Sequence, residues 1–271
     1  MEAAAIRRQY NEIIADTYDS DPQLLTSNTL DLAVELLRDE GVFSEILPPL
    51  RVLDVGMGTG MFLHKLRSSV TRPVLPFGLD ISEKMIEVAT KKLPDLVAEV
   101  DDGANLSRHF DAESFDVAAT HFVTGFVPIE ELSLEIYRKL VSGGMWSFVG
   151  GTSSGYPALR RCATHPMVRV LFGGPSRSLE QMICPSSTTQ VTQIMERAGF
   201  EIAASQTIEP RLHFENFDGF LNFAYHGGWL TPFIEEIGLH RLRGWRKRLL
   251  DQLFFPMTDN HSITLVVARK P

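Results

Sequence analysis

The segment Leu53–Gly60, which reads LDVGMGTG, sets the fold of this chain. An apolar run ends in three glycines, Gly56, Gly58 and Gly60, and a helical pattern begins directly after them. Glycine tolerates positive φ angles and lets the backbone approach a ligand closely, and the first N–H groups of the following helix favour a negatively charged group. The segment predicts a strand, a tight turn and a helix that bind a nucleotide-like ligand, although a plain strand–helix turn would show the same glycines.

Short apolar runs alternate with helical patterns from Arg51 onward. The apolar runs predict strands at Arg51–Val55, Pro76–Ile81, Leu96–Val100, Phe115–Thr120, Met145–Val149, Phe200–Ile208 and Ser262–Lys270. The helical patterns predict helices at Gly60–Ser69, Glu83–Leu93, Leu132–Leu140 and Thr188–Ala198, and Gly150–Pro185 is expected to be a long active-site loop with a short helix. This alternation is typical of crossover units around a mainly parallel sheet.

Acidic residues follow the second and third predicted strands. Asp80 ends the second strand about twenty residues after the glycines, where a carboxylate accepts both hydroxyls of a ribose. Asp102 and Gly103 follow the third strand, where a carboxylate and a backbone N–H suit the edge of an adenine ring. Because the carboxyl ends of parallel strands share one edge of the sheet, these groups are expected to converge on one nucleoside.

The order of five segments carries a family resemblance. LDVGMGTG, GLDIS, DDGANL, FDVAATHF and LVSGGMWSF follow one another over Arg51–Val149. This series resembles the class I SAM-dependent methyltransferases of the small-molecule type. The resemblance implies an α/β fold with a doubly wound, mainly parallel seven-stranded sheet whose last strand is antiparallel. It also implies S-adenosyl-L-methionine (SAM) as cofactor and S-adenosyl-L-homocysteine as product.

The resemblance also assigns cofactor contacts. Asp54, Gly56, Gly58 and Gly60 would bind the methionine portion, Asp80 the ribose, and Asp102 with Gly103 the adenine, with Ile81 and Met85 on either side of the base. Met57 departs from the pattern, since many relatives carry a small residue or Cys there. A nicotinamide-binding domain is the nearest competitor, but its fingerprint is GxGxxG, whereas the third glycine here comes one residue early.

The chain divides into four predicted segments. Residues 1–50 form an N-terminal helical lid, 51–210 the SAM-binding core, 211–261 an aromatic-rich helical cap, and 262–271 the final core strand. The cap is predicted because 211–261 far exceeds the ordinary loop length of about 2–6 residues. In similar enzymes the N-terminal segment covers the cofactor, so Tyr10 and Tyr18 are candidate cofactor contacts, with ordinary helix packing as the alternative.

Two groups of residues are candidates for catalysis and substrate binding. His121 follows the fourth predicted strand, so it is expected at the cofactor edge as a general base or as part of the pocket wall, with Phe122 beside it as a substrate contact. In the cap, Tyr225, His226 and Trp229 surround two flexible glycines and are candidate substrate contacts. His226 is also a candidate catalyst, although a structural role in the cap is the competing interpretation.

Composition restricts the classes of partner. The formal net charge is −8, which argues against a nucleic-acid groove, since phosphate binding needs clustered cations. Cys162 and Cys184 are expected to be reduced thiols, and the dispersed histidines suggest no metal site. No stretch looks like a signal peptide or approaches the roughly 18 apolar residues of a membrane span, so a cytoplasmic protein is expected. The expected oligomeric state is a monomer or a homodimer.

The sequence thus predicts a SAM-dependent methyltransferase of secondary metabolism that acts on a small, partly hydrophobic metabolite. Transfer to oxygen, in a carboxylate or a hydroxyl group, is the favoured reaction, because a carboxylate needs no deprotonation at neutral pH. Transfer to nitrogen or carbon of an aromatic or terpenoid compound is the alternative. A SAM-binding enzyme that transfers no methyl group, or a non-catalytic binding subunit of the same fold, are the rivals from other classes.

Overall fold

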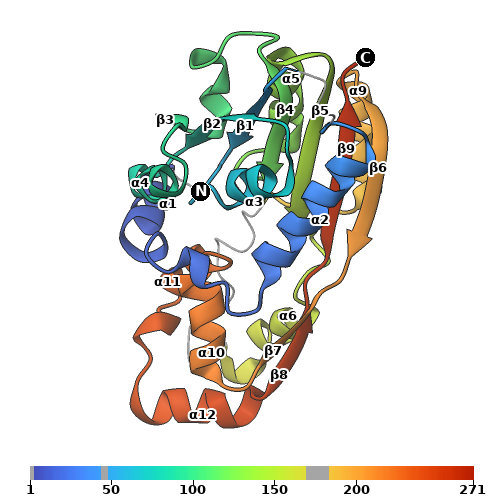
Figure 1. Ribbon diagram of the computed structural model, residues 1–271. Coiled ribbons are helices and arrows are strands. Elements are labelled where there is room, and N and C mark those ends of the chain that lie inside the picture. The colour runs from blue at the N-terminus through green and yellow to red at the C-terminus, as the bar shows by residue number, and fades with distance from the viewer. Residues whose placement is uncertain (1–2, 44–47, 169–182) are drawn as a thin grey trace.

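A seven-stranded sheet in the order β3-β2-β1-β4-β5-β9-β6 forms the centre of the computed structural model, which describes residues 3–43, 48–168 and 183–271 (Figure 1). The strands are β1 (Leu50–Val55), β2 (Val74–Asp80), β3 (Val97–Val100), β4 (Phe115–His121), β5 (Leu140–Gly151), β6 (Glu201–Ile208) and β9 (Ile263–Arg269). The strands from β3 to β5 pair in parallel, whereas β9 runs antiparallel to β5 and β6. The predicted fold class and the final antiparallel hairpin are confirmed.

Helices cover both faces of this sheet. On one face, α2 (Leu25–Asp39) and α3 (Met61–Ser69) pack with strand residues such as Val52 and Val117. On the other face, α5 (Ile129–Lys139) and α9 (Thr188–Arg197) pack with Leu53 and Trp146. Val52 and Leu53, which are neighbours in β1, therefore pack into the apolar cores on opposite faces of the sheet. Because both faces are buried, this strand is a continuous apolar run in the sequence. Helix α4 (Glu83–Lys92) packs against β2 and β3.

The cap combines a small sheet with short helices. Strands β7 (Arg211–Phe214) and β8 (Met257–Asn260) form an antiparallel pair at its base. Between them lie α10 (Phe217–Leu221), the π-helix η4 (Asn222–His226), α11 (Thr231–Glu236), the short 3₁₀ helix η5 (Leu239–Arg241) and α12 (Gly244–Phe254). The sequence analysis expects only helices here. The strands were missed because each is only one short run at the border of a helical segment.

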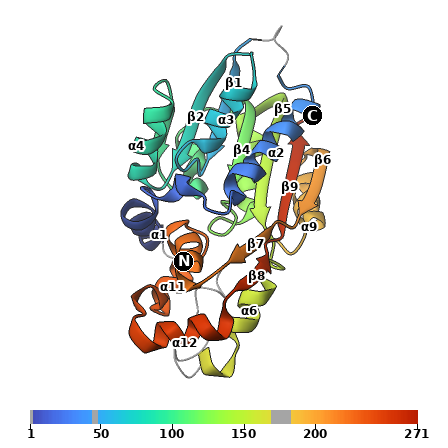
Figure 2. The same cartoon turned by 60° about the horizontal axis from the view of Figure 1, so that its bottom comes forward.

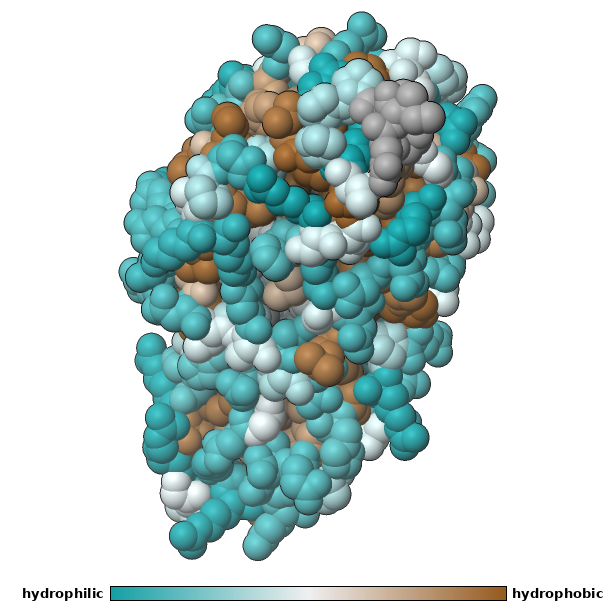
Figure 3. Space-filling model, viewed as in Figure 1, coloured by the Kyte–Doolittle hydropathy of each residue, from teal (hydrophilic) through white to brown (hydrophobic). Residues whose placement is uncertain are grey.

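The cap lies at the end of the molecule opposite the C-terminus (Figures 1 and 2), and its apolar residues form one cluster that continues to Val149 of β5 and Leu265 of β9. Phe214, Phe217, Phe220 and Phe223 pack together in it, so most cap aromatics are structural. The surface in Figure 3 is correspondingly mostly hydrophilic, with apolar residues in scattered spots. Helix α6 (Pro157–Ala163) packs on β8 and joins this core.

The N-terminal segment is divided between two roles. Helix α1 (Ala3–Gln9) continues into the π-helix η1 (Tyr10–Ile14) and the short helix η2 (Tyr18–Ser20), and this part contacts both core and cap. Helix α2 instead packs on the sheet through Leu30, Val34 and Leu37, which are all buried. Within the predicted lid of residues 1–50, α2 packs its apolar stripe into the core, and of the described residues only those before α2 contribute to the cavity described below.

Among the described residues, no helix is long and apolar enough to cross a membrane. Within the predicted loop Gly150–Pro185, the structure shows the end of β5 and helix α6, and residues 169–182 lie outside the described part of the chain.

Candidate active site

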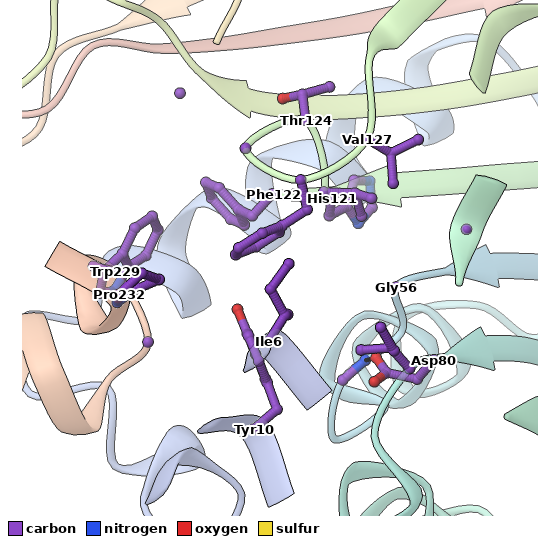
Figure 4. Close-up of a pocket in the computed structure, with 18 of the residues that line it drawn as sticks. Ile6, Tyr10, Gly56, Asp80, His121, Phe122, Thr124, Val127, Trp229 and Pro232 are labelled. Atoms are coloured by element: carbon purple, nitrogen blue, oxygen red, sulfur yellow. Dashed lines mark hydrogen bonds between the residues drawn. The ribbon is translucent and has the colours of Figure 1, made fainter. Parts of the chain in front are cut away.

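A cavity of about 200 Å³ lies between the carboxyl ends of β1, β2 and β4, the N-terminal segment and the cap. Figure 4 shows Gly56 and Asp80 on one side of it and Trp229 and Pro232 of the cap on the other. Tyr10 comes from the N-terminal segment toward the space between them. The predicted cofactor edge and the predicted cap therefore enclose one shared cavity.

The glycine turn has the conformation that its sequence predicts. Gly56, Gly58 and Gly60 all have positive φ angles, of 73°, 53° and 72°. A Cβ atom on Gly56 would lie 2.5 Å from the side chain of Val123, so no larger residue fits at this position. The backbone N–H of Gly58 donates to Asp80 Oδ2 at 2.8 Å, which ties the turn to the end of β2.

Two buried carboxyl groups lie close to this turn. Asp54 and Asp80 are 2% and 6% exposed. Burial raises the pKa of Asp54 to about 8, and the charge of Asp80 adds to this shift. Burial also raises the pKa of Asp80 to about 6, against the opposing effect of backbone hydrogen bonds from Ser82 and Gly58. A positively charged ligand would favour their ionised forms, so this end of the cavity suits a cation that also carries hydroxyl groups.

The end of β3 contributes two adjacent carboxylates. Asp102 accepts a hydrogen bond from the backbone N–H of Ala104 at 3.0 Å and caps the 3₁₀ helix η3 (Gly103–Arg108). Asp101, which the sequence analysis does not select, lines the cavity as well. Hydrogen bonds from His109 and Asn105 lower the pKa of Asp101 to about 2, so it is ionised near neutral pH.

His121 ends β4 and lines the cavity, but it is only 8% exposed. Its Nε2 lies 3.0 Å from Ser147 Oγ, its ring packs edge-on against Phe62 at 4.3 Å, and its Nδ1 has no partner among the described residues. Burial lowers the pKa of His121 to about 3. The imidazole is therefore neutral at physiological pH and a weak base.

Aromatic side chains form the opposite wall. Phe122 has a φ of 60°, an unusual backbone conformation for a non-glycine residue, and its ring meets Trp229 in a T-shaped contact at 4.9 Å. Trp229 in turn stacks on Phe223, whose side chain is buried in the cap core. The rigid cap core thus fixes the orientation of the wall that a substrate would meet.

Several predicted site residues do not reach the cavity wall. Asp54, Gly60 and Met85 are not part of the cavity wall, and Met85 packs with Ile14 and Ala15 of the N-terminal segment. In the cap, the ring of Tyr225 stacks on His240 at 4.9 Å, and His226 is exposed, outside the cavity wall. Neither side chain is part of the cavity wall, so the cavity gives no support to the predicted catalytic and substrate roles of His226 and the predicted substrate role of Tyr225, which stay predictions.

The remaining predicted site residues do come together around the cavity. They are Tyr10, Tyr18, Gly56, Gly58, Asp80, Ile81, Asp102, Gly103, His121, Phe122 and Trp229. Further residues of the cavity wall were not predicted, among them Asp101, Thr124, Tyr156, Cys184, Pro232 and His261. His261 directly precedes the predicted strand Ser262–Lys270, so a strand end could have indicated it, as strand ends indicated the aspartates. Tyr156 lies seven residues after the predicted strand Met145–Val149, inside the predicted loop, where no such signal exists.

Comparisons with known proteins agree with this geometry. Residues 52–144 match the family model described as Methyltransferase domain. The chain is 23% identical to a carboxy-S-adenosyl-L-methionine synthase of Trichodesmium erythraeum, over 65% of this chain and 73% of that protein. Among solved structures, YcgJ of Bacillus subtilis matches with a TM-score of 0.56 at 19% identity, over 89% of this chain and 98% of that one. A putative methyltransferase of Bacillus halodurans matches with a TM-score of 0.56 at 16% identity, over 87% and 98%.

The methyltransferase-domain match over residues 52–144 supports a SAM-dependent methyltransferase with S-adenosyl-L-methionine as its cofactor, and the strand order and the glycine turn agree with a Rossmann-like methyltransferase fold. The matched region contains the glycine turn, Asp80, Asp102 and His121, and it ends inside β5. The cap lies outside it, so the family match leaves the substrate side of the cavity unassigned.

Proposed function

We propose that this protein transfers the methyl group of SAM to an oxygen atom of a small, partly hydrophobic metabolite. The observation that carries the proposal is the shared cavity, which joins an acidic edge at the glycine turn to an aromatic wall of Phe122 and Trp229. The acidic edge suits the cationic, hydroxyl-bearing cofactor, and the aromatic wall suits an apolar acceptor.

On the cofactor side, the proposed roles follow the positions of the side chains. The glycine turn, with Asp54 buried behind it, would hold the methionine portion, Asp80 the ribose, and Asp102 with Gly103 the adenine. Ile81 lines the cavity beside the base position, and Tyr10 and Tyr18 would close over the cofactor. When bound, SAM supplies a methyl group on a positively charged sulfur.

The protein's own contribution is then to position the acceptor and exclude water. Residues 3–20 help to do this because they connect core and cap. Arg8 pairs with Glu235 of α11 at 2.6 Å, and Asp19 accepts a hydrogen bond from Thr59 Oγ1 at 2.5 Å. Burial lowers the pKa of His121 to about 3, which makes its neutral imidazole a weak base, so proton removal by this residue contributes little, and an oxygen nucleophile that is already ionised or readily deprotonated fits the site.

The competing reactions come from the similar proteins. One solved structure with this fold is a phosphoethanolamine N-methyltransferase of Haemonchus contortus, with a TM-score of 0.51, and another is the [4+2]-cyclase SpnF, also with 0.51. The carboxy-S-adenosyl-L-methionine synthase has a name that describes no methyl transfer. Nitrogen as acceptor and a reaction without methyl transfer are therefore the alternatives that the test has to separate.

The test is incubation of the protein with methyl-labelled SAM and a metabolite extract. We expect S-adenosylhomocysteine and one labelled small molecule in equal amounts, with the label on oxygen by mass spectrometry and NMR. Label on nitrogen or carbon would correct the acceptor atom, and product without S-adenosylhomocysteine would support the non-methylating alternative. Failure to bind SAM in calorimetry would contradict the whole proposal. The variant Trp245→Ala, at an exposed cap residue, is the control and should form the same labelled product as the wild type.

A further inference from the structure

Two buried polar side chains at the cap side of the cavity lack partners. Tyr156 and His261 are 9% and 5% exposed, and both line the cavity. Their rings stack with centroids 4.4 Å apart and planes 18° from parallel. Among the described residues, neither Tyr156 Oη nor His261 Nδ1 has a hydrogen-bond partner. A buried polar atom without a partner is costly, and in native proteins such groups often mark a site where a ligand completes the hydrogen bonding.

The backbone holds this pair in place. Tyr156 has φ 58° and ψ 50°, a left-handed conformation that is strained for a tyrosine, and its N–H donates to the carbonyl of Asn260 at 2.9 Å. The carboxylate of Asp259 accepts hydrogen bonds from the N–H groups of Ala158 and Leu159 at 2.9 and 2.8 Å, which anchors the start of α6 to β8. Strained backbone that its surroundings hold in this way clusters at ligand sites.

Two glycines leave room for the imidazole. A Cβ atom on Gly151 would lie 2.9 Å from His261 Cε1, and one on Gly155 would lie 2.8 Å from His261 Nδ1. Trp229 contacts the same imidazole edge-on at 5.4 Å, so the pair adjoins the aromatic wall. The ring of His261 is thus enclosed by glycine backbone and two aromatic side chains.

We propose that the stacked pair Tyr156 and His261 binds a hydroxyl group of the acceptor substrate and sets specificity from the cap side. This inference deepens the proposed function and rests on it. The phenol donates a hydrogen bond, and an imidazole whose proton is on Nε2 accepts one at Nδ1. A hydroxyl group accepts and donates at once, so it satisfies both atoms, whereas an ether satisfies only the phenol.

The charge state of the pair agrees with a neutral ligand group. Burial raises the pKa of Tyr156 and lowers the pKa of His261 to about 4, so both side chains are neutral near pH 7. A carboxylate would lose its hydration in exchange for contacts with neutral groups, which is unfavourable without a cation. The pair therefore favours a hydroxyl group over a carboxylate on the substrate.

The experiment measures binding of three probes to protein saturated with S-adenosylhomocysteine: 2-naphthol, 2-methoxynaphthalene and 2-naphthoate. We expect the wild type to prefer 2-naphthol by roughly tenfold or more, because a site built around a hydroxyl rejects analogues that lack it. Tyr156→Phe and His261→Asn should abolish this preference. Tyr137→Phe, a matched change away from the cavity, should keep it.

Thermal unfolding of the ligand-free protein adds a second readout. Removal of an unpartnered buried hydroxyl should leave the Tm of Tyr156→Phe equal to or above that of the wild type. A lower Tm, no binding of 2-naphthol to the wild type, an unchanged preference in Tyr156→Phe, or tighter binding of 2-naphthoate would each overturn the inference. If binding depends on Tyr156 but no methyl transfer occurs with any acceptor, the proposed function fails, and the pair is a hydroxyl-binding site but not one for a methyl acceptor.

Discussion

The backbone N–H of Gly58 donates a hydrogen bond to the Asp80 carboxylate at 2.8 Å, and the other oxygen of that carboxylate accepts one from Ser82 at 2.8 Å. One side chain at the end of β2 thus organises both the glycine turn and the start of α4. This contact joins two motifs that lie far apart in the sequence, and the shape of the cofactor end of the cavity depends on it.

The first prediction concerns Asp80→Asn. An amide has only one acceptor oxygen, so one of the two backbone donors would face an NH₂ group. We expect SAM affinity to fall by roughly 10-fold to 100-fold, in line with the loss of hydrogen bonds to a charged group. Isothermal titration calorimetry measures this affinity for SAM. Asp95→Asn, at an exposed carboxylate paired with Arg67, serves as control and should bind SAM normally.

The second prediction concerns pH and stability. The pKa of Asp54 is about 8 in the folded protein and near 3.8 in the unfolded chain. At pH values between these two, the folded state therefore binds more protons than the unfolded state. Rising pH therefore destabilises the ligand-free protein across the window from about pH 4 to pH 8, by up to about 1.4 kcal/mol per pH unit for one proton. Urea unfolding at several pH values checks this, and Asp54→Asn should flatten the slope. A slope that is the same in both proteins would contradict the assignment.

The third prediction concerns His121→Asn. Since burial lowers the pKa of His121 to about 3, we expect kcat at saturating SAM to stay within about tenfold of the wild type. The shape of the pH–rate profile between pH 5 and pH 8 should also be unchanged. A loss of roughly 10²-fold to 10⁴-fold would instead establish His121 as a general base.

The fourth prediction compares two tryptophans. Trp229→Ala should raise the KM of the acceptor while the Kd of SAM stays nearly constant, because Trp229 belongs to the wall with Phe122. Trp229→Ala should also lower the free energy of unfolding, by no more than about 3–5 kcal/mol, since the indole ring packs on Phe223. Trp245 is 65% exposed and lies outside the cavity wall, so Trp245→Ala is the control. It should leave the KM of the acceptor and the Kd of SAM unchanged.

The fifth prediction concerns the contact between the N-terminal segment and the cap. Glu235 pairs with Arg8 and also contacts Gln9, so Glu235→Gln weakens the link between α1 and α11. We expect faster SAM dissociation in stopped-flow experiments, with less than about 1 kcal/mol lost in unfolding free energy, because the pair is partly exposed. Glu12→Gln, a change at an exposed residue of the same segment, should leave the dissociation rate unaltered.

Local patterns were sufficient to predict the core. Each strand of the parallel sheet carries its own apolar run, and the positive φ angles of Gly56, Gly58 and Gly60 follow from residue type. Asp80 and Asp102 were found because the ends of parallel strands share one edge. The cap was harder, since apolar spacing cannot distinguish a ring that faces a cavity from one that faces a core. Tyr225 and His226, which were predicted to contact the substrate, are not part of the cavity wall.

The sequence by itself determined the fold class and the acidic edge, because these depend on residue types at strand ends and on local backbone freedom, and its resemblance to a known family supplied the cofactor. Only the tertiary structure decided which cap residues meet the cavity. Tyr156 precedes α6 and His261 precedes β9, and they stack only because β8 brings Asp259 against the start of α6. This contact depends on packing between segments that are far apart in the sequence. The residue pattern around Tyr156 or around His261 therefore cannot predict it.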